Sequence, residues 1–354
     1  MAYTPHKIVK PEKLVATAMG LLERELVVPK LFTRKGVDDF KGARTDTLNM
    51  RVPGVLAAHD YAWRNDRSQP IQVDQYSDRT VAVKFGGNAY SAVELTDEQY
   101  EFDFNAWSEL LAAQCQAVAR RLEYGAVKAM VDGKYAVTVG ATAGNLSNDI
   151  VEANRVLNTV GVPAASRTLL VGSEVEAVMQ TDSAFNIASN VGDANANSAL
   201  HDAVIAKWKG ANVVRSLDLP SDEAYLFAGS AFAFLNAAPH VPDSVKGGTT
   251  SFEGIALRWV RDYDPMYMVE RSVVNTWYGF APVLDPILYW DAANDREAVS
   301  EGEYLVRGVR LKLGGKDSYF AADAGTGAAA VGKALGLTKR SAATAAKAPA
   351  SPAA

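Results

Sequence analysis

The residue pair with the most evident chemical potential is Asp262 and Asp264, which flank Tyr263 and precede Pro265. Two carboxylates at this spacing, at the end of a strand, are suited to binding a cation or to acting as an acid–base pair. A soluble hydrolase is therefore one hypothesis. A polar turn before the proline explains the same residues without chemistry, and we favour it because no other acidic or histidine motif accompanies the pair.

The other residues able to do chemistry are few and scattered. The four histidines are His6, His59, His201 and His240, and no two of them have the HxH or HxxxH spacing of metal ligands. Cys115 is the only cysteine, which excludes an intramolecular disulfide and a Cys-based zinc site, and its helical surroundings favour a buried thiol. We expect no catalytic residue, no metal, no cofactor, and hence no enzyme.

Composition describes a globular chain with no strong preference for an acidic partner. The 354 residues are 48% hydrophobic and 22% charged, enough for one large or two ordinary domains. The net charge of -5 argues against a general nucleic-acid binder, which needs clustered Lys and Arg. No signal peptide or membrane span is evident, so we expect a soluble protein made in a reducing cytoplasm.

The first third of the chain contains a predicted helix and a predicted ribbon. Apolar residues at helical spacing predict a helix over 11–28, and Pro29 is expected to stop it. Strict alternation predicts half-buried strands at 47–52 and 80–85. The 27 residues from Pro53 to Arg79 are too many for a tight turn and indicate a long, projecting two-stranded loop. Such a ribbon is marginal alone, and a neighbouring subunit would support it.

The rest of the chain predicts one long helix followed by an α+β unit. The clearest helix runs over 105–130, where apolar residues step by three or four. Short alternating elements then predict a compact α+β domain over about 135–264, with a flexible hairpin end at Gly247–Thr250. Further strands are expected at 255–260, 266–277 and 304–313. The Ala- and Gly-rich sequence from Ala321 onward predicts a solvated appendage.

Three stretches resemble the major capsid proteins of tailed phages, particularly the coat proteins of actinobacterial phages with the HK97-type fold. The first runs from Leu21 to Leu31 and continues from Gly42 to Pro53. The second is Val81–Met130, where a strand and an acidic stretch lead into the long helix. The third is Gly254–Pro265, ending in Arg-Asp-Tyr-Asp-Pro, and onward to Gly279.

The resemblance implies an α+β, HK97-like fold made of named parts. An N-terminal arm would come first, then the extended E-loop, the peripheral domain with its spine helix, the axial domain, a return to the peripheral domain, and a low-complexity basic tail. The implied ranges are 1–40, 41–93, 94–134, 135–264, 265–315 and 316–354, respectively.

The resemblance also implies a structural role in the virion. Many copies of the chain would form pentamers and hexamers, assemble in the host bacterial cytoplasm into an icosahedral head, and enclose double-stranded DNA without sequence-specific binding and without a membrane. Scaffolding, portal and decoration proteins are the further partners implied. A mildly acidic chain suits a shell that surrounds DNA without gripping it.

The E-loop carries the candidate intersubunit contacts. Aromatic side chains supply much apolar area, so three of them are candidate anchors, with packing inside the loop as the alternative. Arginines of the loop are candidates for charge pairs with neighbours, with a solvated face as the alternative. The residues are Tyr61, Trp63, Tyr76, Arg51, Arg64 and Arg67.

Three alternatives to a phage coat protein stay open from the residues. A bacterial encapsulin has the same fold and encloses enzyme cargo, although no cargo-binding signature is recognisable. A hydrolase rests only on Asp262 and Asp264. Another virion protein, such as a tail or decoration protein, is the third.

Overall fold

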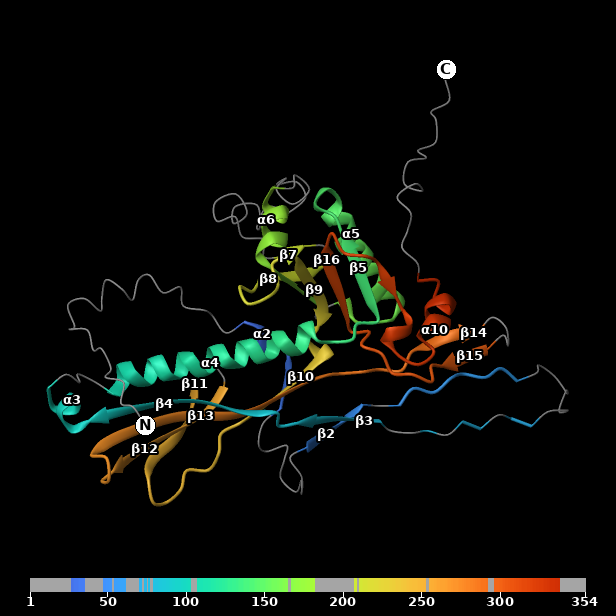
Figure 1. Ribbon diagram of the computed structural model, residues 1–354. Coiled ribbons are helices and arrows are strands. Elements are labelled where there is room, and N and C mark those ends of the chain that lie inside the picture. Colours follow the sequence, from blue (N-terminus) through green and yellow to red (C-terminus); the bar gives the residue numbers. More distant parts are fainter. Residues whose placement is uncertain are drawn as a thin grey trace.

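The computed structural model describes most of the chain, in segments separated by gaps. The described residues are 27–35, 47–52, 54–61, 70–71, 73–74, 76, 79–102, 107–164, 167–181, 207–208, 210–252, 255–291 and 296–337. They form two sheets joined by one long helix, with a narrow ribbon and a small hairpin at one end (Figure 1). Most of the predicted arm 1–40 and of its helix 11–28 lies outside these residues.

A six-stranded sheet is organised around its longest strand, β13. β12 and β10 pair with successive parts of one edge of β13, and β4 pairs along the other edge. β11 extends the sheet beyond β12, and β1 extends it beyond β10. The strands are β1 (Thr33–Lys35), β4 (Gly87–Thr96), β10 (Phe232–Ala237), β11 (Lys246–Phe252), β12 (Ile255–Asp264) and β13 (Val269–Pro282).

The long helix α4 (Trp107–Val131) lies on this sheet (Figure 1). Its buried residues Val118, Leu122, Ala126 and Met130 recur every four positions, which places them on one face. At 1.5 Å per residue the helix is roughly 37 Å long. The predicted helix over 105–130 is therefore confirmed.

A seven-stranded mixed sheet stands above one end of α4 (Figure 1). β16 pairs in parallel with β5 and antiparallel with β9, so a late strand completes a sheet begun much earlier in the chain. Its strands, in spatial order, are β17 (Ser318–Tyr319), β5 (Val137–Ala141), β16 (Gly308–Leu313), β9 (Glu223–Ala228), β6 (Arg167–Val171), β8 (Ala211–Arg215) and β7 (Lys207–Trp208). Its longer helices are α5 (Leu146–Thr159), α6 (Ser173–Thr181) and α10 (Ala328–Ala334).

One hydrophobic cluster, the bridging core, connects the two sheets. Alternation along β6 places Leu169 and Val171 in the core under α5 and α6, and turns Leu170 the other way into the bridging core. That cluster also contains Met130 of α4 and Phe234 of β10. The buried members of the bridging core are Val28, Phe32, Ala126, Val127, Met130, Leu170, Leu219, Tyr225, Phe227, Ala231, Phe232, Phe234 and Leu305.

The predicted ribbon forms, and its base rests on its own chain. β2 (Thr47–Val52) and β3 (Arg79–Lys84) pair antiparallel over their whole length. Val83 of β3 is fully buried against Ala233 and Leu235 of β10. The ribbon does lie on a support, as expected, but at its base the support is the chain's own strand β10 and not a neighbouring subunit.

The remaining elements are short. β14 (Leu288–Asp291) and β15 (Arg296–Val299) pair as a separate hairpin. The helical pieces are α2 (Val28–Leu31), α3 (Asp97–Phe102), η2 (Ala143–Asn145), η4 (Gly229–Ala231) and η5 (Ala322–Ala324). Pro29, expected to end a helix, instead lies in the first turn of α2, where a missing N–H costs nothing.

Two sequence predictions about strands need correction. Gly247–Thr250 is not a hairpin end but part of β11, which pairs along β12. A side chain at Gly247 would clash with the carbonyl oxygen of Trp259, so the glycine here permits close packing. The predicted strand 304–313 forms only over 308–313, while Tyr304 and Leu305 make isolated bridges.

The predicted compact unit 135–264 does not correspond to one sheet. Strands β10, β11 and β12 lie in that range but belong to the six-stranded sheet. β16 and β17 come after it but belong to the seven-stranded sheet. The chain thus crosses between the sheets near Phe232 and crosses back after Pro282, a non-local exchange that local periodicity cannot predict.

The predicted tail 316–354 is also wrong over its first part. Residues 316–337 form β17, η5 and α10, and Phe320, Val331 and Leu337 are buried in the core of the seven-stranded sheet. Phe320 meets the Tyr304 ring edge-on at 5.7 Å between centroids. Gly325 and Gly327 have positive φ and lie against Tyr304, which an L side chain would not readily allow.

Phe320→Ala should therefore lower the free energy of unfolding by about 3–5 kcal/mol, the usual cost of truncating a buried phenylalanine. Lys333→Ala, at an exposed position of α10, should change it by less than about 0.5 kcal/mol. Denaturant unfolding of the two variants measures the difference. Equal stabilities would show that this segment does not contribute to the core.

Candidate assembly surfaces

The long loop between β2 and β3 projects from one end of the molecule, and its two legs lie side by side (Figure 1). The Gly54 N–H donates to the Tyr76 hydroxyl at 3.4 Å, and His59 Nε2 lies 2.7 Å from Asp74 Oδ2. Within the described residues of the loop, the two legs pair through backbone hydrogen bonds only where β2 lies beside β3. The loop is thus two-legged as predicted, with side chains tying the legs together.

The candidate contact residues of the loop are partly described. Tyr61 and Tyr76 are exposed, and Arg51 is exposed on β2. The hydrogen bond to the Tyr76 hydroxyl belongs to the loop itself, in line with the alternative role of packing within it. Trp63, Arg64 and Arg67 lie outside the described residues.

Sequence reasoning missed the most exposed apolar side chains of this loop. Ile71 is 71% exposed and Val73 is 82% exposed. They stand two positions apart, so in extended chain they point to the same side. The alternation of apolar and polar residues in Ile71-Gln-Val73 could have indicated an apolar contact surface. The sequence analysis predicted only the aromatic residues of the loop as apolar contacts.

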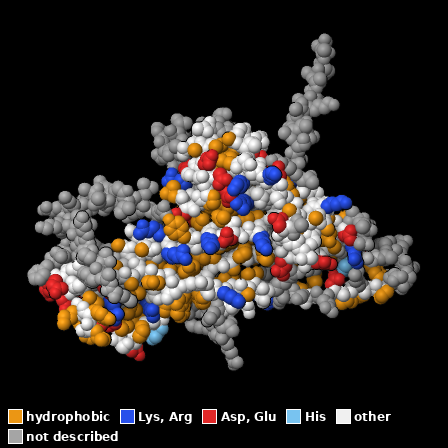
Figure 2. Space-filling model, in the orientation of Figure 1, with side chains coloured by type: hydrophobic (Ala, Val, Ile, Leu, Met, Phe, Trp, Pro, Cys, Tyr) orange, Lys and Arg blue, Asp and Glu red, His pale blue; other side chains and the backbone are white. Residues whose placement is uncertain are grey.

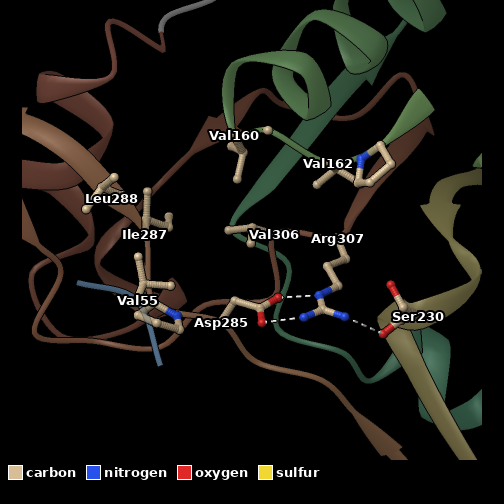
Figure 3. Close-up of a pocket in the computed structure, with 12 residues that line it drawn as sticks. Val55, Val160, Val162, Ser230, Asp285, Ile287, Leu288, Val306 and Arg307 are labelled. Atoms are coloured by element: carbon tan, nitrogen blue, oxygen red, sulfur yellow. Dashed lines mark hydrogen bonds and ion pairs between the residues drawn. The ribbon is translucent and has the colours of Figure 1, made fainter. Parts of the chain in front are cut away.

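The β14–β15 hairpin and a pocket lie beside the base of the loop. The Ala58 N–H donates to the Glu297 carboxylate at 2.9 Å. Val55 lines a pocket of about 480 Å³ together with Ile287 and Leu288 (Figure 3). These contacts fix the direction in which the loop leaves the body.

The pocket itself is mostly apolar, and its charged groups are satisfied. Arg307 makes a two-pronged ion pair with Asp285, at 2.5 and 2.6 Å, and donates to the Ser230 carbonyl at 3.3 Å (Figure 3). A carboxylate engaged through both oxygens by one guanidinium is suited to structure rather than to proton transfer. The apolar lining is Val55, Val160, Val162, Ile287, Leu288 and Val306.

The turn between β12 and β13 forms a second exposed apolar surface, at the opposite end from the loop (Figure 1). Met266 is 86% exposed, Tyr267 is 76% exposed, and Met268 also faces solvent. Figure 2 shows hydrophobic side chains gathered at this end of the molecule. Sequence reasoning considered only the acidic residues of this turn.

The acidic residues of that turn are engaged in holding it. Arg271 lies 3.0 Å from Asp262 and 3.2 Å from Asp264, so one cation on the paired strand contacts both carboxylates. Asp264 also accepts the Met266 N–H at 3.0 Å, an interaction typical of a turn residue. The turn interpretation is thereby supported, and the geometry offers the hydrolase hypothesis no free carboxylate pair.

Further chemistry is not indicated within the described residues. No group of three or more His, Cys, Asp or Glu side chains there could hold a metal ion. No helix in the described part of the chain is long and apolar enough to cross a membrane. Cys115 is half-buried beside α4's apolar face, and burial raises the pKa of its thiol, which opposes a nucleophilic role.

One buried carboxylate ties the arm to the long helix. Glu123 of α4 accepts the N–H groups of Val27 and Val28, each at 3.1 Å, at the start of α2. Burial, with a smaller contribution from Asp218, raises the pKa of Glu123 to about 7, although the two N–H groups and Lys30 act in the opposite direction. This contact was not foreseen, since nothing in Leu122-Glu123-Tyr124 distinguishes an inward from an outward glutamate.

The family model described as phage capsid protein matches residues 89–290, more than half of the chain. The chain therefore belongs to the phage capsid protein family. The comparison with curated protein sequences gives no significant match.

Solved structures show the same fold at low sequence identity. A structure from Mycobacterium phage Che8 has a TM-score of 0.56 at 14% identity, covering 88% of this chain and 94% of that one. The capsid of cyanophage P-SCSP1u gives 0.55 at 9%, covering 89% and 91%. The capsid of the native GTA particle gives 0.53 at 11%, covering 89% and 96%.

These matches confirm the resemblance drawn from the residues. The fold is α+β and HK97-like, and the protein is a structural major capsid protein of a tailed phage, located in the virion. The family match supports neither the encapsulin nor the hydrolase alternative.

The raised pKa of Glu123 makes a prediction about stability. Between pH 4.5, the ordinary value for glutamate, and about 7, the folded protein keeps a proton that the unfolded chain releases. The free energy of unfolding should therefore fall as pH rises through this window. Glu123→Gln should flatten that dependence, measured by denaturant unfolding at pH 5 and 7.5. Glu98→Gln, at an exposed site on α3, should leave it as in the unmodified protein; a flattening there too would refute the assignment.

Proposed function

We propose that many copies of this chain assemble as pentamers and hexamers into the icosahedral head that encloses the phage's double-stranded DNA, without catalytic activity. The observation that carries the proposal is the placement of exposed apolar side chains at the two opposite ends of a rigid body. Such side chains are costly to leave in water, and contacts that join one end to a different surface of the next copy build rings or larger lattices.

The parts named by the family resemblance fit this arrangement. The E-loop, proposed over 41–93, contains the β2–β3 ribbon and its projection. The peripheral domain contains the six-stranded sheet and α4, and the axial domain contains the seven-stranded sheet. The N-terminal arm, proposed over 1–40, includes α2 and β1, and Glu123 holds it where α2 begins. The discontinuous sheets support assigning the axial domain by strand membership rather than by the single range 135–264.

The proposal that the protein has no enzymatic function rests on the contacts of its acidic residues. Asp262 and Asp264 share Arg271, and Asp285 is engaged by Arg307, so the acids best placed for chemistry hold structure instead. Scaffolding, portal and decoration proteins are proposed as further partners, with assembly in the host cytoplasm.

Electron microscopy of the full chain, expressed alone and with its neighbouring genes, tests the shell role. Uniform closed shells or ring-shaped capsomers are expected under at least one condition. Small discrete oligomers under both conditions would contradict the proposal. Neighbouring peroxidase or ferritin-like genes, in place of portal and terminase genes, would favour an encapsulin.

The loop contact is tested by Ile71→Asp with Val73→Asp. We expect this double variant to lose shells or capsomers while its melting temperature stays within a few degrees of the original, because both side chains are exposed in the single subunit. Val151→Asp with Leu217→Asp, at two exposed apolar residues away from the loop, is the matched control for two added charges and should still assemble. Normal shells from the double variant would remove these residues from the interface.

A further inference from the structure

Exposed cations that pair with no carboxylate of the described residues follow one face of α4. Arg120, Arg121 and Lys128 are exposed on the helix, and Lys134 is exposed just beyond its end. Positions 120, 124 and 128 are successive i,i+4 neighbours, and 121 lies one turn before 124, so the three helical cations share one face with the exposed Tyr124. We call Arg120, Arg121, Lys128 and Lys134 the basic strip. Lys and Arg side chains recur along the band where α4 runs (Figure 2).

The strip differs from several arginines elsewhere in the described chain. Arg155, Arg261, Arg271, Arg307 and Arg310 each pair with a carboxylate. Among the described residues no carboxylate pairs with any member of the strip.

The nearby carboxylates do not neutralise the strip. Glu123, on the same helix, points inward and is occupied by the Val27 and Val28 N–H groups. Asp132 follows the helix and leaves the local balance positive. A chain with a net charge of -5 therefore presents a positive line on its longest helix.

Helix electrostatics does not account for the strip. A cation near the C-terminus of a helix is favoured by the helix dipole, but this effect is confined to the last turn. Lys128 lies in that turn. Arg120 and Arg121 lie about ten residues before the helix end, so their placement needs another reason.

The spacing of the strip fits a linear polyanion. Arg120 and Lys128 are separated by about 12 Å along the helix axis, a length over which duplex DNA carries about seven phosphate charges. We propose that the basic strip is the surface of the subunit that faces the enclosed DNA and contacts its phosphates. This inference rests on the proposed function, because only an enclosing shell brings DNA to one face of every copy.

The expected contact is weak for one subunit and strong only in sum. Four cations would release counterions from about four phosphates, giving a slope of about -3.6 for log K against log salt. Contacts of this kind carry no base specificity, since phosphates are alike in every sequence. Many copies facing one DNA molecule would add their contacts by multivalency, while each one stays weak enough to let DNA move.

The test uses the full-length protein and a fluorescent duplex of about 30 base pairs. Binding is followed by anisotropy over a series of salt concentrations. Replacing Arg120, Arg121 and Lys128 with Ala should weaken binding and reduce the salt slope by about 2.7. The matched control replaces three exposed cations elsewhere on the molecule with Ala: Lys84 on β3, Lys246 on β11, and Lys316 in the loop between β16 and β17. It removes the same net charge and should keep the original slope.

Two results would overturn the proposal. Equal losses in the two triple variants would show a general charge effect, and unchanged binding in the strip variant would show that DNA does not use this face. A strip variant that binds DNA normally but no longer forms particles with co-expressed proteins would assign the strip to a protein partner instead. Particle formation by the unmodified chain is scored separately, so failure of the shell role is distinguishable from failure of this contact.

Discussion

The architecture depends on the bridging core, where two sheets and α4 share one set of buried side chains. Phe32 stacks on Phe232 at 4.9 Å between ring centroids, and Phe234 stacks on Phe280 at 4.8 Å. Phe227 reaches the same cluster from the seven-stranded sheet. Because this core is close-packed, the two sheets cannot shift relative to each other without losing contacts. The protein is therefore a stiff body, and a stiff body is what a lattice of defined angles requires.

Stiffness in the body makes the exposed surfaces at its ends meaningful. The loop leaves the body in a direction set by Val83 against β10 and by Glu297 at Ala58. The opposite turn is held by Arg271 between two aspartates. Apolar side chains at both ends are thus presented at fixed positions. Weak contacts at such positions can be made and broken during assembly, yet they add up when every copy makes several.

Sequence reasoning predicted the elements whose residues carry a local pattern. Alternation in Thr47–Val52 predicted β2, and four-residue spacing in Val118, Leu122 and Ala126 predicted α4. It failed where the deciding contacts are distant in sequence. Residues 316–337 look like low-complexity sequence, and only Phe320 against Tyr304 turns them into core. The unit 135–264 failed for the same reason, because β16 enters the earlier sheet between β5 and β9.

The surfaces were predictable to a lesser degree than the fold, and the reason is physical. Exposure is a property of the folded surface, so Tyr267 and Val73 could not be ranked above other apolar residues by local sequence. Whether a charged side chain has a partner is likewise a property of the folded structure. Glu123 and Arg120 stand three residues apart, yet the Glu123 carboxylate is buried and accepts two backbone N–H groups. The Arg120 guanidinium is exposed and pairs with no carboxylate among the described residues. That division gives α4 an apolar face toward the sheet and an exposed positive face on its other side.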